Sequence, residues 1–137
     1  MQEKTIAVIG GTLFHGTRKD PVNNACLVIR EDSIVYAGST DRASIPPEAE
    51  VIDATGHAII PGIIDGHMHL TSMPAFLDTS GHLQQNIRAI RKLRSSMASG
   101  VTSVVNVGGC PESQPLKTAI EDGIIPPMAR MLVAGMV

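Results

Sequence analysis

The sequence predicts an α/β fold with two segments, a run of short strands followed by alternating strands and helices. Residues 1–61 hold brief runs of β-branched residues separated by Gly, Asn, Asp and Pro, which is typical of short strands joined by turns. Residues 62–137 alternate apolar runs with helical periodicity, in the order strand, helix, strand, helix, strand. That order predicts parallel strands joined by right-handed crossovers.

In the first segment we expect a small antiparallel sheet with strands at residues 4–9, 25–30, 33–37, 49–53 and 57–60. The charged step from Arg30 to Ser33 indicates a tight hairpin. Residues 54–56 separate a second strand pair, and residues 39–48, which are rich in small polar residues and proline, indicate a surface loop. Gly10 and Gly11 are interpreted as a tight turn, because they lack the spacing of a phosphate-binding loop.

The second segment opens with a short strand at residues 63–67, and a helix is predicted at residues 82–99. Apolar residues at spacings of three and four mark one face of that helix: Leu83, Ile87, Ile90, Leu93 and Met97. The basic residues fall mainly on its solvent side: Arg88, Arg91, Lys92 and Arg94. Asp78, Thr79 or Ser80 can cap the start of the helix, and Gly100 suits a left-handed end.

Three further elements follow this helix. Residues 101–107 are predicted to form a fully buried strand, which ends at Gly108 and Gly109. A second helix is expected at residues 116–122, with Pro115 near its first turn and Gly123 beyond its end. Residues 130–137 predict a third apolar strand.

The composition limits the classes of function. The chain has 137 residues, of which 43% are hydrophobic and 18% charged, and its net charge of −2 gives no electrostatic footprint for nucleic acid. No uninterrupted apolar run approaches the roughly 18 residues of a membrane span. The N-terminus does not follow a secretory pattern, and Cys26 and Cys110 are more simply thiols than a disulfide. We therefore expect a cytoplasmic protein without nucleic-acid or membrane partners.

His67 and His69 are the candidate metal ligands. In an extended segment residues i and i+2 point to the same side, so two imidazoles can meet at one point at the end of a strand. Neutral imidazole suits zinc, iron or nickel, although most isolated histidine pairs of this spacing are solvated or hydrogen-bonded. Asp65 shares that strand face and can orient an imidazole from behind it, or it can hydrogen-bond the turn at Gly66.

The remaining histidines and the second cysteine have simpler interpretations. His15 and His57 lie in turns of the first segment and are expected to face solvent. His82 near the start of the helix and Cys110 after the second strand lie where substrate loops lie, but a surface histidine and a loop thiol are the commoner cases.

The ten residues 61–70, PGIIDGHMHL, resemble the metal-binding signature of the amidohydrolase superfamily. Residues 11–17, GTLFHGT, and residues 51–57, VIDATGH, are similar to the segments that precede this signature in the family, with His15 in place of an acid. Residues 100–109, GVTSVVNVGG, most resemble the second strand of the imidazolonepropionase-like and Xaa-Pro dipeptidase-like branch. Val105 and Asn106 replace the Arg-Asp often found there.

The resemblance implies a (β/α)8 barrel preceded by a small β-sandwich segment, with one or two divalent metals, zinc by default. His67 and His69 would hold the more buried ion, and a metal-activated water would attack a C–N bond of an amide, peptide or cyclic amide. In the family, a carboxylated lysine or glutamate, two further histidines and a catalytic aspartate come from the fourth and later strands. No position here corresponds to them.

The chain is shorter than the barrel that this resemblance implies. Such a barrel takes roughly 200 to 250 residues, so three of its strands and two helices fit within residues 62–137. Because the sequence also stops within an apolar strand, we expect the N-terminal piece of a longer hydrolase, inactive alone and self-associating through its exposed barrel edge. Two alternatives stay open: a non-catalytic metal-binding or assembly module, and a small doubly wound domain in which the motif is accidental.

Overall fold

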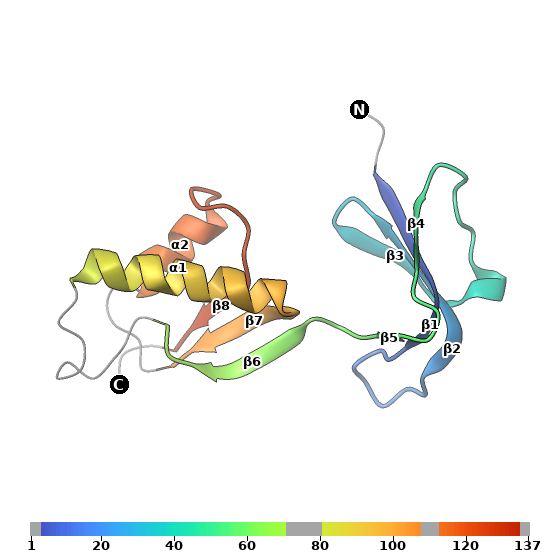
Figure 1. Cartoon of the computed structure of the whole chain (residues 1–137), viewed down its shortest axis with the longest axis horizontal. Coiled ribbons are helices and arrows are strands. Elements are labelled where there is room, and N and C mark those ends of the chain that lie inside the picture. Colours follow the sequence, from blue (N-terminus) through green and yellow to red (C-terminus); the bar gives the residue numbers. More distant parts are fainter. Residues whose placement is uncertain (1–3, 71–80, 108–112, 135–137) are drawn as a thin grey trace. The chain divides into compact units, whose positions relative to one another are not determined.

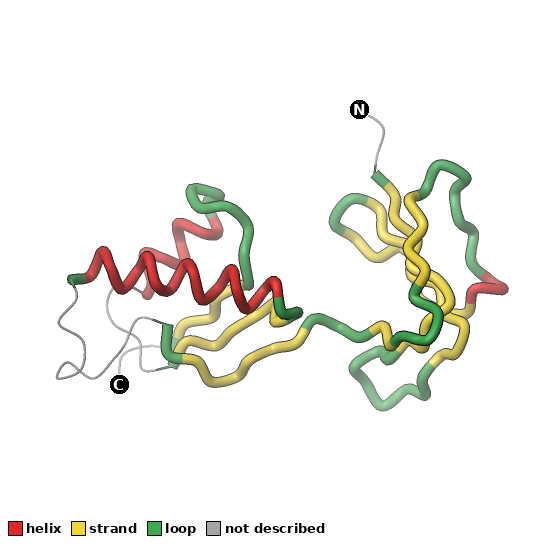
Figure 2. Tube along the Cα trace, in the orientation of Figure 1, coloured by secondary structure: helices red, strands yellow, loops and turns green. Residues whose placement is uncertain are grey.

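A computed structural model describes residues 4–70, 81–107 and 113–134 of the chain (Figure 1). The chain divides into two units, Met1–Pro61 and Gly62–Val137, and each is described by itself. Strands make up most of the first unit, whereas both α-helices belong to the second (Figure 2).

The first unit contains one five-stranded sheet. Its strands are β1 (Thr5–Leu13), β2 (Val22–Arg30), β3 (Ser33–Ser39), β4 (Glu50–Asp53) and β5 (Ala58–Ile59), and a short 3-10 helix, η1 (Thr40–Arg42), follows β3. The strand order is β3-β2-β1-β4, and β5 also pairs with β1. The first three strands are antiparallel, as predicted, and the predicted hairpin turns at Glu31, which has a φ of +52°.

The prediction of a wholly antiparallel sheet is wrong for β4 and β5, because both run parallel to β1. Glu50 pairs with Ile6 at one end of β1, and Ile59 pairs with Leu13 at the other. β4 and β5 therefore lie one after the other along the same neighbour. Residues 54–56 connect β4 to β5 without reversing the direction of the chain.

Gly10 and Gly11 form a bulge within β1 and not the tight turn predicted. The register of β1 against β2 shifts between Ile9 and Gly11, and Gly10 has a φ of +84°. A Cβ atom on Gly10 would lie 2.5 Å from the Thr55 hydroxyl oxygen. Glycine therefore supplies both the left-handed backbone and the space for the residues between β4 and β5.

The described residues of the second unit form three parallel strands and two helices. The strands β6 (Ile63–Met68), β7 (Val101–Asn106) and β8 (Arg130–Val133) lie in the order β6-β7-β8, so the predicted parallel pairing is confirmed. The helices α1 (His82–Ala98) and α2 (Ser113–Glu121) cover one face of this sheet (Figure 1). The core between the layers consists of Leu70, Ala89, Leu93, Val104, Leu116, Met128, Ala129 and Met131.

Helix α1 occupies nearly the predicted residues, but only part of its predicted apolar face is buried. Its N-cap is Gly81, and Gly100 has a φ of +86°, as its predicted left-handed end requires. Leu83 and Ile87 are 74% and 56% exposed, whereas Ala89 and Leu93 are fully buried. The small side chain of Ala89 lets the helix pack closely on β7, so the buried stripe is rotated from the predicted one. The predicted caps Asp78, Thr79 and Ser80 lie outside the described residues.

The remaining elements differ from prediction in smaller ways. The expected full burial of residues 101–107 is wrong, because only Val104 and Asn106 of β7 are buried. Helix α2 begins at Ser113, three residues before the predicted start, and Gly123, which was predicted to lie beyond its end, has a φ of +71°. Residues 135–137 of the third predicted strand lie outside the described part. None of the helices described is long and apolar enough to cross a membrane.

Candidate metal centre

The imidazoles of His67 and His69 lie side by side at the carboxyl end of β6. Their ring centroids are 5.3 Å apart, with an angle of 71° between the ring planes. Both residues are exposed. The carboxyl ends of parallel strands are the edge at which α/β folds place their ligands, and this edge presents two nitrogen donors.

A β-bulge places these histidines. Asp65 of β6 pairs with Val104 and Met68 pairs with Asn106, so Gly66 and His67 form an extra step on β6. The bulge interrupts the simple alternation from which we predicted a shared face, although the two rings remain neighbours. Bulges of this kind commonly re-aim side chains beside active sites.

The carboxylate of Asp65 reaches across this bulge. Its Oδ1 accepts a hydrogen bond from the backbone N–H of His67 at 3.0 Å. This contact ties the strand together over Gly66, which is the second of the two roles considered for Asp65 from sequence. The carboxylate thus holds the backbone that carries His67, the first candidate ligand.

Side chains from two other elements hold the peptide group between His69 and Leu70. The ammonium of Lys92 on α1 donates to the His69 carbonyl oxygen at 3.0 Å, and the Leu70 N–H donates to Oδ1 of Asn106 at 2.9 Å. Asn106 is fully buried, and its Nδ2 donates to Oγ of the equally buried Ser113 at 2.9 Å. The one hint in the sequence is the asparagine at the end of β7, which replaces an aspartate often found there in the family, whereas Lys92 is predicted only to lie on the solvent side.

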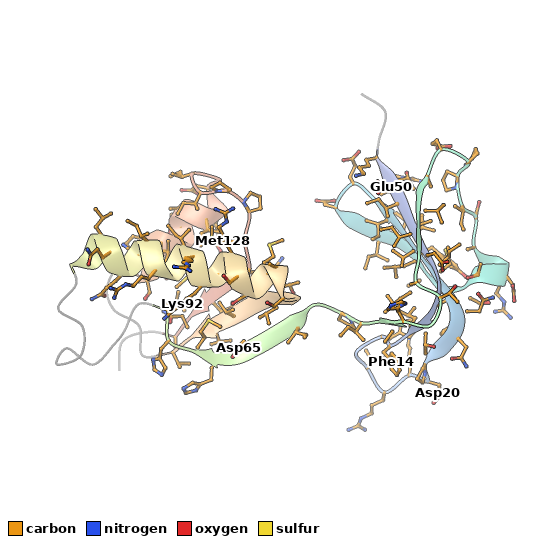
Figure 3. All side chains as sticks on the ribbon, in the orientation of Figure 1. Phe14, Asp20, Glu50, Asp65, Lys92 and Met128 are labelled. Carbon is orange, nitrogen blue, oxygen red and sulfur yellow. The ribbon has the colours of Figure 1, made fainter. Side chains whose placement is uncertain are left out.

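A hollow of about 440 Å³ opens beside the second histidine, between α1 and the end of β6. Figure 3 labels Lys92 on α1 and Asp65 on β6, the two elements that flank it. It is lined by Met68, His69, Arg91, Lys92, Ser95 and Ser96. Two basic side chains therefore face the region next to His69.

The other candidates from sequence lie elsewhere. His57 is in the first unit, where its Nδ1 lies 3.0 Å from the carbonyl oxygen of Thr55, and His15 follows β1 in the same unit. His82 is the first residue of α1, and Cys110 lies outside the described residues. Across residues 4–70, 81–107 and 113–134, no three His, Cys, Asp or Glu residues form a group that could hold a metal ion.

In comparisons with known proteins, this chain is similar to deaminases and to other hydrolases. It is 31% identical over 106 residues to adenine deaminase 4 of Rhizobium meliloti, a match that covers 77% of this chain and 16% of the deaminase. It is 39% identical over 59 residues to the imidazolonepropionase of Streptomyces griseus, covering 43% of this chain and 15% of that protein. The chain thus spans a small part of the length of these relatives. No family model matches it.

Solved structures agree with these relatives. Molinate hydrolase has 27% sequence identity and a TM-score of 0.82, with all of this chain and 31% of the hydrolase covered. A prolidase bound to N-methylphosphonate-L-proline has 28% identity and a TM-score of 0.77, with 96% of this chain and 32% of the prolidase covered. These findings confirm the resemblance to the amidohydrolase superfamily, including its imidazolonepropionase-like and Xaa-Pro dipeptidase-like members.

Proposed function

We propose that this chain is the N-terminal part of a metal-dependent hydrolase that acts on a C–N bond through a metal-activated water. The observation that carries the proposal is the pair of adjacent imidazoles at the carboxyl end of the first parallel strand. The likeness to about a third of molinate hydrolase and of a prolidase supports a role within a longer chain. In that whole protein we propose a (β/α)8 barrel and a small β-sandwich.

The spacing of the two rings fits a shared metal ion. A zinc ion lies about 2.0 Å from an imidazole nitrogen, so two imidazoles that share one ion must be close neighbours. The ring centroids of His67 and His69 are 5.3 Å apart. The two rings are therefore close enough to contribute two of the ligands of one ion.

The residues of this chain would hold and orient the ion. When bound, a divalent ion supplies Lewis acidity, which lowers the pKa of a water ligand and polarises a carbonyl group. His67 and His69 would contribute two neutral nitrogen donors, and Asp65 would keep the His67 backbone in place through its 3.0 Å hydrogen bond. We propose one or two divalent ions, with zinc as the first candidate because imidazole is among its preferred ligands.

The substrate we propose is a small amide, a peptide or a cyclic amide. Its support is the nature of the relatives, which include an imidazolonepropionase, an enamidase and a prolidase. We also propose a cytoplasmic location, with which the buried free thiol of Cys26 is compatible.

We propose that the 137-residue chain is inactive alone and associates with itself. Two imidazoles leave a divalent ion short of ligands, because catalytic zinc sites use three protein ligands. Apolar side chains of the parallel sheet are exposed as well, with Ile64 at 67% and Leu132 at 48%. Exposed apolar residues on an unpaired sheet edge favour association.

The test is a zinc titration of the purified chain, followed through the imidazole nitrogen resonances of its five histidines. We expect selective shifts at His67 and His69, and an affinity at least tenfold weaker in His67→Ala and in His69→Ala, because each removes half of the donor set. His57→Ala is the matched control and should bind as the parent does. Sedimentation of the same samples gives the state of association.

Two results would contradict parts of the proposal. The proposed metal centre is refuted if zinc shifts the nitrogen resonances of all five histidines equally. It is also refuted if zinc binds the double variant His67→Ala/His69→Ala as tightly as the parent. Tight binding of one ion per chain by the monomer favours the non-catalytic module instead. The zinc-loaded chain should also fail to hydrolyse N-acyl amino acids, Xaa-Pro dipeptides and cyclic amides, and turnover that the double variant lacks would disprove its inactivity.

A further inference from the structure

The peptide group between His69 and Leu70 is held at both of its polar ends by side chains. Its carbonyl oxygen accepts from Nζ of Lys92 at 3.0 Å, and its N–H donates to Oδ1 of Asn106 at 2.9 Å. The two side chains come from different elements, α1 and β7, and lie 23 and 36 residues further along the chain. A peptide group at the end of an edge strand would ordinarily be solvated on one side or both.

The peptide group before His69 is held as well. The carbonyl oxygen of Met68 accepts from the N–H of Val107 at 3.0 Å. With both neighbouring peptide planes fixed, the φ and ψ of His69 are fixed, and the backbone in turn restricts the rotamers of the side chain. The held backbone on both sides of His69 therefore restricts the directions that its imidazole can take.

Asn106 is suited to hold the Leu70 N–H because its own side-chain amide is held in one orientation. It is fully buried, its amide nitrogen donates to the buried hydroxyl of Ser113 at 2.9 Å, and its own carbonyl accepts from the N–H of Ala134 at 3.1 Å. The two side-chain bonds also fix which end of the amide is oxygen, because the Leu70 N–H can only donate. A buried amide with both ends satisfied holds one orientation, since losing either partner leaves a buried polar group unpaired.

We infer that Lys92 and Asn106 are positioning residues that clamp the His69–Leu70 peptide group and thereby aim the His69 imidazole at the metal shared with His67. This inference rests on the proposed metal centre. Groups that orient a metal ligand commonly change metal affinity by about 10- to 100-fold when they are removed. The clamp is distinctive because it acts through the backbone of the ligand and not through its second ring nitrogen.

The direction in which Lys92→Met changes zinc affinity distinguishes a positioning role of Lys92 from an effect of its charge. Lys92→Met removes a positive charge near a cation site, which by charge alone strengthens cation binding. Loss of the clamp has the opposite effect, because the ligand is no longer held in place. Arg91→Met is the matched control: Arg91 lies one residue away on α1, carries the same charge and lines the same hollow. Methionine keeps the length of the side chain and favours a helix at both positions.

The experiment measures zinc affinity and backbone protection in the same five proteins: the parent chain, Lys92→Met, Arg91→Met, Asn106→Asp and Asn106→Leu. We expect Lys92→Met to bind zinc roughly tenfold more weakly, and Arg91→Met to bind as tightly as the parent or more tightly. Asn106→Asp keeps an oxygen for the Leu70 N–H and adds a negative charge near the cation site, so it should bind zinc at least as tightly as the parent. Asn106→Leu should lose affinity, and if it does not fold, Lys92→Met on the surface of α1 still decides the question.

The clamp is tested separately without metal. Hydrogen exchange at the Leu70 amide should be faster in Asn106→Leu, and the coupling constants that report the His69 side-chain rotamer should average in Lys92→Met but not in Arg91→Met. Unchanged rotamer couplings in Lys92→Met, or equal zinc affinities for Lys92→Met and Arg91→Met, overturn the inference. Failure of the parent chain to bind zinc at His67 and His69 would defeat the proposed function, while the metal-free measurements would still decide whether the clamp exists.

Discussion

Replacing Leu93 by alanine is the sharpest test of how the second unit is held together. Leu93 is fully buried on α1 and packs within the cluster that contains Leu70, Val104 and Met131. The change removes three carbon atoms, worth about 2.4 kcal/mol at roughly 0.8 kcal/mol for each buried group. The cavity that remains adds to this loss, so we expect the free energy of unfolding to fall by about 3 to 4 kcal/mol.

The assay is urea unfolding followed by far-ultraviolet circular dichroism at the helix band, because both α-helices lie in the second unit. Tyr36 is the single tyrosine and lies in the first unit, so its fluorescence follows that unit separately. Leu83→Ala is the control on the same helix, and because Leu83 is 74% exposed we expect a change within about 0.5 kcal/mol. Equal losses for the two variants would refute the packing described for α1.

Two further substitutions test the remaining parts of the fold. A Cβ atom on Gly62 would lie 2.7 Å from Cβ of Thr102, so Gly62→Ala should lower the stability of the second unit by about 1 to 3 kcal/mol. Thr102→Gly in the same chain should recover part of that loss, and a parental urea midpoint for Gly62→Ala would contradict the contact. In the first unit, hydrogen bonds from the Thr55 side chain and backbone lower the pKa of Asp53. The parent should therefore have a higher free energy of unfolding than Asp53→Asn, and this difference should be fully present above about pH 4, the ordinary aspartate pKa. The difference should disappear as the pH falls through the lowered pKa of Asp53. A carbon-detected titration that places the pKa of Asp53 at or above the ordinary aspartate value would disprove the hydrogen bonds from Thr55 to its carboxylate.

Local patterns predicted the elements that depend on neighbouring residues. The hairpin after Arg30 and the ends of α1 and α2 at Gly100 and Gly123 follow from turn and capping chemistry within a few residues. The parallel order of β6, β7 and β8 follows from the alternation of strands and helices. The paired histidines follow in the same way, because both candidate ligands lie in one short segment.

Features that depend on distant residues were predicted less well. The direction of β4 and β5 follows from their pairing with β1, about 45 residues earlier, which nothing in residues 50–59 specifies. The buried face of α1 depends on how closely Ala89 approaches β7, and periodicity alone favoured the larger side chains of Leu83 and Ile87. The bulge at Gly66 similarly depends on the register between β6 and β7.

The candidate site combines both kinds of information. Residues 65–69 supply the imidazoles and the carboxylate that holds the His67 backbone, so the identity of the ligands is a local property of the sequence. The orientation of His69 depends instead on Lys92 and Asn106, which approach only when α1 and β7 have packed against β6. A motif match can therefore name the ligands of such a site, whereas their orientation follows only from the assembled unit. For this reason a metal-binding assay on this chain reports on the packing of its second unit as well as on the motif.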